Sequence, residues 1–191
     1  MEPGSGFRSE IMMTYKEAVI EAMGWLGEQP DTLFIGQTVG VPGSYMFGSL
    51  EKVPAEKLLE LPVAEELQMG MTLGLGLEGY VPISIYPRID FLLLALNQLV
   101  NHIDKIGVMS EDKMRPRIII RTSIGPRKPL DGGPQHTNDY IKEIRSMCRY
   151  IRVISLDADL PPESIINQYK MSYNSPYNLP VSLLVERGDL Y

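Results

Sequence analysis

The sequence has little cysteine and no long apolar run, and each absence excludes a class of protein. Its 191 residues include one cysteine, Cys148, so no disulfide can form within the chain. A single thiol is typical of a reducing compartment, and we interpret Cys148 as a small core or surface residue rather than a nucleophile. The longest uninterrupted apolar run, residues 91–96, is far shorter than the ~18 residues of a membrane-spanning helix. We therefore expect a cytoplasmic protein with no membrane partner.

Positive charge is also scarce. Lysine and arginine number 18 against 24 aspartate and glutamate residues, which leaves a net charge of −6 at pH 7 and a pI near 5.0. This balance argues against nucleic acid as a partner. With 44% apolar and 22% charged residues, the composition is that of a globular domain with an ordinary hydrophobic core. We expect a flexible N-terminal arm over residues 1–11 and a single domain over residues 12–191.

Several familiar catalytic motifs are missing. The sequence contains no GxxxxGK[ST] phosphate loop, no GxSxG serine elbow, and no HExxH or paired-cysteine spacing for zinc. The glycines of Gly74-Leu75-Gly76 lie inside a predicted helix, so they do not form a dinucleotide-binding turn after a strand. We predict no metal ligands on this chain.

What the sequence does contain is an alternation of helical and strand patterns. Thr14 and Glu17 form a capping-box pattern for a helix that ends near Gly27. We predict strands at 32–35, 81–85, 117–122, 151–155 and 181–186, and further helices at 64–79, 89–107, 139–148 and from 161 onward. This alternation predicts an α/β fold, a mostly parallel sheet with helices on both faces. Ligands of such sheets bind beyond the carboxyl ends of the strands, where we expect the segments 37–49, 61–66, 86–91 and 123–137.

The stretch 61–80 is unusual for a helix. It reads LPVAEELQMGMTLGLGLEGY, with two carboxylates in its first turn and glycines at 70, 74, 76 and 79. Each glycine inside a helix costs about 1 kcal/mol relative to alanine, so the packing along this helix must favour close approach. Gly70 and Gly74 lie four residues apart and suit contact with a helix of another subunit. Packing within the chain would explain the same glycines.

Considered singly, the polar residues of these segments have ordinary explanations. Glu65 and Glu66 at a helix N-terminus complement the helix dipole, by roughly 0.3–1 kcal/mol each. His136 suits a solvated loop, and Asp90 suits the cap of a helix. None of these residues identifies a site alone.

Six stretches taken together follow a familiar order and spacing. They are MTYKEAVIEAM, TLFIGQTVG, PVAEELQMG, DFLLLALNQLVNHIDK, GPQHTND and PVSLLVERGDLY. The third resembles a P-[IV]-[SA]-E-x-x-x-x-G motif, and the fifth resembles a GPQHS loop. The set, covering residues 12–191, resembles the pyrimidine-binding domain of transketolase-like thiamine diphosphate enzymes, in particular beta subunits of the first component of 2-oxo-acid dehydrogenase complexes. The implied fold is the pyrimidine module of the thiamine diphosphate-binding fold.

The resemblance implies a cofactor and catalytic residues. In that family a glutamate at the position of Glu65 hydrogen-bonds the pyrimidine ring of thiamine diphosphate and supports removal of a proton from the thiazolium carbon. Phe91 matches an aromatic residue near the pyrimidine, and Tyr86 is a second candidate for that ring contact. His136 matches a loop histidine that faces the substrate and can donate a hydrogen bond to a developing oxyanion.

Basic residues in the same segments suit an anionic substrate, such as a carboxylate or a sugar phosphate. They are Arg88, Arg127 and Lys128. Arg88 stands where relatives often carry an aromatic residue, and a surface salt bridge would explain it equally well.

Two further departures concern the partner. The sequence ends at Tyr191, where the relatives continue into a C-terminal domain, and this difference argues against membership of a multi-enzyme dehydrogenase complex. The sequence also lacks GDG followed 25–30 residues later by asparagine, the family's motif for magnesium and diphosphate. We expect a separate diphosphate-binding subunit to carry GDG-x(25–30)-N and Mg²⁺, in an assembly that is a homodimer or a heterotetramer.

These observations lead to two hypotheses of different class. The first is the pyrimidine-binding subunit of a two-subunit thiamine diphosphate-dependent enzyme, of the transketolase or the 2-oxo-acid dehydrogenase or decarboxylase type. The alternative is a non-catalytic α/β interaction or regulatory subunit that retains the fold. A nucleotide-binding doubly wound domain fits the architecture but not the loops.

Overall fold

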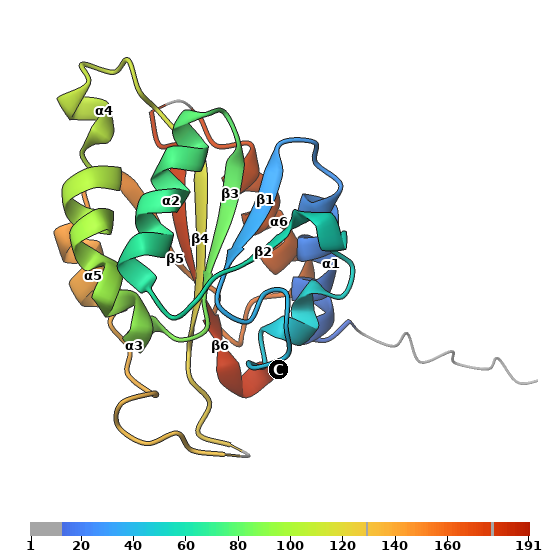
Figure 1. Cartoon of the computed structure of the whole chain (residues 1–191). Helices are drawn as coiled ribbons and strands as arrows, with labels where there is room; N and C mark the ends of the chain where they lie inside the picture. The colour runs from blue at the N-terminus through green and yellow to red at the C-terminus, as the bar shows by residue number, and fades with distance from the viewer. Residues whose placement is uncertain (1–12, 129, 177) are drawn as a thin grey trace, which may run out of the picture.

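The computed structural model describes residues 13–128, 130–176 and 178–191, so the expected N-terminal arm lies outside the described residues. Its strands form one six-stranded sheet in the order β2-β1-β3-β4-β6-β5, with every neighbouring pair parallel (Figure 1). The strands are β1 (Thr32–Gly36), β2 (Leu58–Glu60), β3 (Val81–Tyr86), β4 (Ile118–Ile124), β5 (Ile151–Ser155) and β6 (Val181–Arg187). The prediction of a parallel α/β sheet is confirmed.

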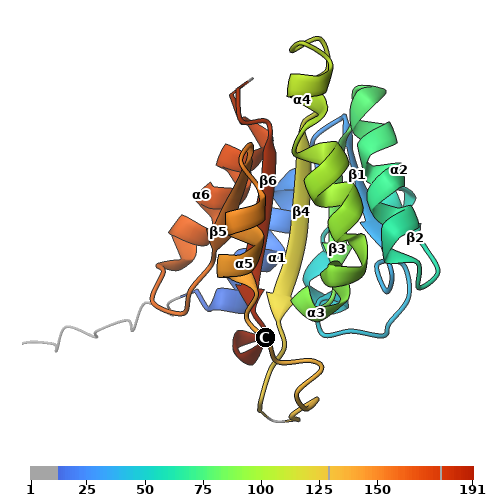
Figure 2. The ribbon, with the colours of Figure 1, turned by 90° about the vertical axis from the view of Figure 1, so that its left-hand side faces the viewer.

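Helices cover both faces of the sheet, as Figures 1 and 2 show. One face carries α1 (Tyr15–Gly27) and α6 (Pro162–Tyr173), and the other carries α2 (Glu65–Leu77), α5 (Ile141–Met147) and the helical segment from Ile89 to Met109. The capping box predicted for α1 is present, because Thr14 and Glu17 bond each other's backbone N–H. No helix in the described part of the chain is long and apolar enough to span a bilayer.

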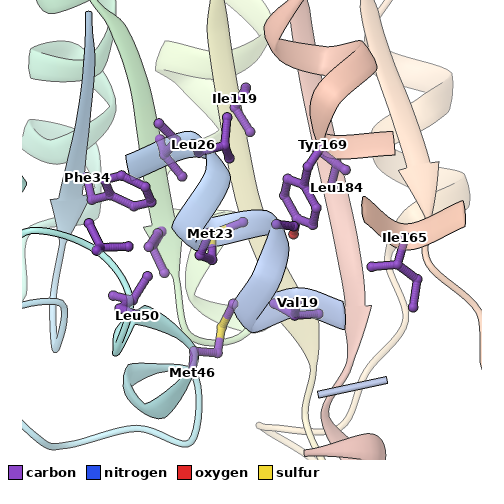
Figure 3. Close-up of a cluster of buried hydrophobic side chains, with 14 of the residues drawn as sticks. Val19, Met23, Leu26, Phe34, Met46, Leu50, Ile119, Ile165, Tyr169 and Leu184 are labelled. Carbon is purple, nitrogen blue, oxygen red and sulfur yellow. The ribbon is translucent and has the colours of Figure 1, made fainter. Parts of the chain in front are cut away.

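Two apolar cores lie on the two sides of the sheet, because successive strand residues point to opposite faces. On the first side, Val19, Met23 and Leu26 of α1 pack against the sheet (Figure 3). Ile119 belongs to this core, whereas its neighbours Ile118 and Ile120 belong to the second core, under α2 and α5. This double coverage explains why β4 begins with three consecutive isoleucines rather than an alternating pattern.

Two features differ from the predicted elements. The helix predicted at 89–107 is divided into α3 (Ile89–Leu92), the 3₁₀ turn η3 (Leu93–Ala95), the π-helical segment η4 (Gln98–Ile103) and α4 (Ile106–Met109). A leucine-rich run carries no signal for such a change of hydrogen-bonding period. Strand β2 was not predicted, because three residues are too few to show an alternating pattern. Three further 3₁₀ turns are η1 (Phe47–Leu50), η2 (Ala55–Lys57) and η5 (Gly188–Leu190).

The four glycines of the stretch 61–80 have three different environments. A methyl group on Gly76 would lie 2.8 Å from the Cβ of Pro116 and 3.1 Å from Ile118, so Gly76 allows α2 to pack closely at the start of β4. Gly79 has φ +95° and ends the helix in the left-handed region. At Gly70 and Gly74 a methyl group would meet no described atom within 4 Å. Packing within the described chain therefore explains Gly76 but not Gly70 or Gly74.

Candidate active site

The loops after three parallel strands meet at the carboxyl edge of the sheet. They enclose an open pocket of about 530 Å³, lined by Gln37, Thr38, Gly43, Ser44, Tyr45, Pro87, Arg88, Phe91 and His136. The segments 37–49, 86–91 and 123–137, predicted to lie at this edge, each contribute to the lining. The fourth predicted segment, 61–66, does not line this pocket.

Arg88 lies in the pocket with its charge unneutralised by any described carboxylate. Its guanidinium carbon is 5.7 Å from the centroid of the Tyr45 ring, and its Nη1 donates a hydrogen bond to the backbone oxygen of His136 at 3.3 Å. The described residues give it no ion pair, so the surface salt bridge considered as an alternative is absent from this part of the chain. A fixed guanidinium in a pocket is suited to bind a carboxylate or phosphate.

His136 and Phe91 are brought together from segments 45 residues apart in the chain. Their rings meet edge to face, with centroids 5.6 Å apart. The Nδ1 atom of His136 lies 2.7 Å from the backbone oxygen of Gly132. Because a carbonyl oxygen only accepts, Nδ1 carries a proton, and Nε2 of the neutral ring is an acceptor. Donation from Nε2 to an oxyanion therefore needs the doubly protonated ring.

Glycine and asparagine residues fold the His136 loop back onto the pocket. A methyl group on Gly125 would lie 1.9 Å from the backbone oxygen of His136, so only glycine allows this approach. Asn138 donates from Nδ2 to Asp90 Oδ1 at 2.5 Å and to the backbone oxygen of Pro134 at 2.6 Å. Asp90 thus connects the loop to α3. The N-cap residue of α3 is Arg88, and its side chain makes no capping hydrogen bond.

Tyr45 forms the opposite wall of the pocket from the loop after β1. Its hydroxyl donates to the backbone oxygen of Pro87 at 3.2 Å and also hydrogen-bonds the Ser123 hydroxyl. Burial raises the pKa of Tyr45, so the phenol stays protonated. The Tyr191 ring packs edge-on against it, with centroids 5.2 Å apart.

Glu65 and Glu66 differ sharply in environment. Glu66 Oε1 accepts from Asn97 Nδ2 and Gln98 Nε2, both at 3.4 Å, so this carboxylate links α2 to the neighbouring helix. Glu65 is only 8% exposed, and its carboxylate makes no hydrogen bond or ion pair with any described residue. A nearly buried carboxylate at the positive end of a helix dipole, with its acceptor sites unused, fits a cationic or N–H-bearing ring.

Tyr86 lies behind Glu65 rather than in the pocket. Its side chain is buried in the second core, and its hydroxyl donates to the backbone oxygen of Glu65 at 3.3 Å. Burial raises the pKa of Tyr86, so this hydroxyl keeps its proton. Its contact in the described chain is with the first turn of α2, and its suggested contact with a cofactor ring stays a prediction.

Buried amide and hydroxyl groups fix α2 on the sheet. Gln68 donates from Nε2 to the backbone oxygen of Ile85 at 2.9 Å and to Ser84 Oγ at 3.1 Å. Thr72 donates to the same Ser84 hydroxyl at 2.8 Å. These bonds hold α2 against β3, and the hydrogen bond from Tyr86, the last residue of β3, to the Glu65 backbone oxygen shows that Glu65 lies near the carboxyl end of that strand. The polar positions on the inner face of α2 were not recognised from the sequence.

The other basic candidates lie outside the pocket. Arg127 and Lys128 are exposed, and the backbone N–H of Arg127 donates to Asp189 Oδ1 at 2.7 Å.

Four lining residues were not singled out from the sequence. They belong to the glycine-rich loop after β1 and are Gln37, Thr38, Ser44 and Tyr45. Thr38 has φ +56°, a conformation that a β-branched residue rarely adopts. The sequence of the loop after β1 does not indicate this left-handed conformation at Thr38.

Comparisons with known proteins agree with the resemblance. No protein-family model matches the chain. A pyruvate dehydrogenase E1 component subunit beta from Chaetosphaeridium globosum is 34% identical over 111 residues, which cover 56% of this chain and 33% of the relative. The mitochondrial subunit of that name from Saccharomyces cerevisiae is 29% identical, covering 70% and 37%. A 2-oxoisovalerate dehydrogenase subunit beta from Bacillus subtilis is 28% identical, covering 60% and 36%. The matches span about a third of the length of these curated relatives.

A solved structure shares the fold. It is described as a split gene transketolase, an inactive beta4 tetramer, and it superposes with a TM-score of 0.62 at 17% identity, covering 91% of this chain and 50% of that one. The chain is therefore similar in sequence to beta subunits of pyruvate and 2-oxoisovalerate dehydrogenases, and it shares its fold with a split gene transketolase.

Proposed function

We propose that this chain is the pyrimidine-binding subunit of a two-subunit thiamine diphosphate-dependent enzyme that breaks or forms a bond next to a carbonyl carbon. The observation that carries this proposal is Glu65, a nearly buried carboxylate at the N-terminus of α2 without a partner in the described chain. Its neighbour Glu66 is partnered and serves as the internal contrast. The sequence relationship to 2-oxo-acid dehydrogenase beta subunits supports the same assignment.

In this proposal Glu65 and Phe91 hold the pyrimidine ring of the cofactor. Glu65 shares a proton with a ring nitrogen in a site from which water is largely excluded. Phe91 presents a flat apolar face. Tyr86 acts on Glu65 through its hydrogen bond to the Glu65 backbone oxygen. The bound cofactor supplies the electron sink that a carbonyl cleavage needs.

The pocket residues Arg88 and His136 would bind the substrate. Arg88 faces the pocket without a described carboxylate partner, so it suits the anionic group of a 2-oxo acid or a sugar phosphate. His136 presents Nε2, which accepts from a substrate hydroxyl in the neutral ring and donates to an oxyanion in the protonated ring. Arg127 and Lys128 would act only on the approach of an anion, because they are exposed outside the lining.

An exposed apolar stripe on α2 is the proposed contact with the second subunit. It comprises Leu67, Gly70, Gly74 and Leu77, at spacings of three, four and three residues, which is the repeat of helix-on-helix packing, and Val63 precedes the helix in sequence. Val63 is 66% exposed, Leu67 54% and Leu77 43%, and Leu94 on the adjacent helical segment is 65% exposed. The two glycines let a partner helix approach closely.

The second subunit would carry the diphosphate site. This sequence lacks GDG-x(25–30)-N, so we propose that Mg²⁺ and its hard oxygen ligands lie on the partner. The structural relative is described as an inactive assembly of beta chains from a split gene, which supports a chain that needs a different subunit for activity. Homodimeric and heterotetrameric assemblies are both compatible with such a pair.

Cofactor binding separates this proposal from a non-catalytic subunit with the same fold. The test is to mix the chain with the candidate subunit that carries the motif and to titrate thiamine diphosphate with Mg²⁺. The proposal predicts that the cofactor raises the melting temperature of the pair and has little effect on either subunit alone. A pair that associates but shows no cofactor-dependent shift would support the interaction or regulatory role instead.

A further inference from the structure

The carboxylate of Glu60 makes an unusual set of hydrogen bonds at the edge of the sheet. Glu60 is the last residue of β2, the short strand that pairs with β1. Its Oε1 accepts from the backbone N–H of Thr38 at 2.7 Å. Its Oε2 accepts from the backbone N–H groups of Val39 and Gly40 at 2.8 and 2.7 Å. One side chain thus binds three successive amides of the loop after β1.

Three successive N–H groups converge on one anion only when the backbone turns sharply. Thr38 supplies the turn with φ +56°, a conformation costly for a threonine and stable only when surrounding contacts enforce it. Gly43 packs against it, since a methyl group on Gly43 would lie 2.5 Å from Thr38 Cγ2. Thr38 Oγ1 also donates to Ser44 Oγ at 2.9 Å. Glu60 therefore holds residues 38–40 at the start of the loop, and the contacts of Thr38 with Gly43 and Ser44 connect this start to the later part of the loop.

The residues fixed in this way are the wall of the pocket. Thr38, Gly43, Ser44 and Tyr45 all line it, and the Arg88 guanidinium packs over the Tyr45 ring. Glu60 itself does not line the pocket, and so it acts only through the loop.

We infer that Glu60 is a positioning residue, whose carboxylate fixes the turn at Thr38 and thereby holds Tyr45 against Arg88. The assignment of this pocket as the substrate site rests on the proposed function, whereas the role of Glu60 in holding the loop and Tyr45 does not. Replacing the carboxylate by an amide removes one of the two acceptor oxygens and places an N–H₂ group against a backbone donor. The amide therefore cannot reproduce the three bonds.

The test uses the free chain and needs no cofactor. Hydrogen exchange is measured by mass spectrometry, and the ring at position 45 is observed by ¹⁹F NMR after 3-fluorotyrosine is placed there. Glu60→Gln is expected to speed exchange of residues 38–45 by roughly tenfold and to shift and broaden the ¹⁹F resonance, with exchange in α2 and β4 unchanged. Glu60→Asp keeps both oxygens and is expected to recover part of the protection. Glu51→Gln removes the same charge from an exposed carboxylate with no described partner and should change neither signal.

Either of two results would overturn the inference. The first is unchanged exchange in residues 38–45 together with an unchanged ¹⁹F resonance in Glu60→Gln. The second is faster exchange throughout the chain, which would make Glu60 a general stabiliser. Should Glu60→Gln fail to fold, Glu60→Asp decides between the same outcomes. Because Glu65 is intact in each variant, a failed assignment of the cofactor site would leave this result unaffected.

Discussion

Gly74 and Gly76 lie two residues apart on α2, and a methyl group would find open space at Gly74 but the side chain of Pro116 at Gly76. Gly74→Ala should therefore raise the free energy of unfolding of the isolated chain by about 0.5–1 kcal/mol, since alanine is the better helix former. Gly76→Ala should lower it by about 1–3 kcal/mol through overpacking. Chemical denaturation of both variants measures the difference.

The exposed apolar stripe on α2, which includes Gly74, predicts an effect on assembly. Gly74→Leu should weaken association with the diphosphate-binding subunit by roughly tenfold or more, because it prevents close approach of a partner helix. The isolated chain should keep its stability. Titration calorimetry of the variant against the partner measures the effect, and Glu78→Ala at the exposed end of α2 is the control. Unchanged affinity for Gly74→Leu would place the interface elsewhere.

Arg88 should control the affinity for an anionic substrate. Arg88→Met should raise the KM of the reconstituted pair for its anionic substrate by about 10- to 100-fold, with a smaller change in kcat, because a charged hydrogen bond contributes about 1.5–3 kcal/mol. Lys128→Met removes a positive charge outside the pocket and should leave KM within about twofold. Equal effects of the two substitutions on KM would mean that Arg88 acts only by long-range electrostatic attraction and does not bind the substrate directly.

Arg121 and Glu186 form a fully buried ion pair, each with 0% of its side chain exposed. Tyr169 and Tyr191 also hydrogen-bond this pair from their hydroxyl groups. Glu186→Gln leaves the guanidinium unpaired and should lower the free energy of unfolding by about 3–5 kcal/mol. Replacing both members by apolar residues should cost less than the sum of the two single substitutions. The exposed pair of Lys52 and Glu21 is the control, where Lys52→Met should cost at most about 1 kcal/mol.

Cys148 gives a prediction about pH. Burial, and to a lesser extent the carboxylate of Asp104, raises the pKa of the Cys148 thiol to about 12. In the unfolded chain the thiol has its usual pKa near 8.5, so its contribution to stability is complete below that pH. As the pH rises from about 9 to 12, only the unfolded state loses the proton, and the free energy of unfolding should fall. Cys148→Ser should remove this part of the decline.

The thiol should also react slowly. At pH 8 the thiolate fraction of Cys148 is roughly a thousandfold smaller than that of a free cysteine, so alkylation by iodoacetamide should be slower by about that factor. Rapid alkylation of the folded chain at pH 8 would contradict the half-buried, neutral thiol and would support a nucleophilic role for Cys148.

The sheet could be predicted because its apolar strands carry their own pattern. The strands predicted at 32–35, 81–85 and 181–186 are short runs of apolar and β-branched residues, and such a run can be recognised from adjacent residues alone. Arg121 shows the limit. It reads as the polar end of a strand, yet it is fully buried, because its guanidinium pairs with the carboxylate of Glu186 on the neighbouring strand β6. A partner 65 residues away leaves no local signal.

The location of the candidate pocket could be predicted from parallel topology, which brings the loops after the strands to one edge of the sheet. This topology places segments 86–91 and 123–137 at that edge, whereas the contact between the Phe91 and His136 rings was not predicted. The inward direction of Tyr45 and Thr38 does not follow, because it depends on the left-handed turn that Glu60 holds. The difference between Glu65 and Glu66 required the positions of Asn97 and Gln98 on the next helix.

The most direct test of the central claim compares two adjacent carboxylates in the reconstituted pair. Glu65→Gln and Glu66→Gln remove the same charge one residue apart, so any general electrostatic effect is shared. The measurement is kcat in the presence of saturating thiamine diphosphate and Mg²⁺. A catalytic Glu65 predicts a loss of at least about 100-fold for Glu65→Gln and a change within a few-fold for Glu66→Gln. Undiminished kcat in Glu65→Gln would contradict the assignment of this chain as the pyrimidine-binding half of the active site.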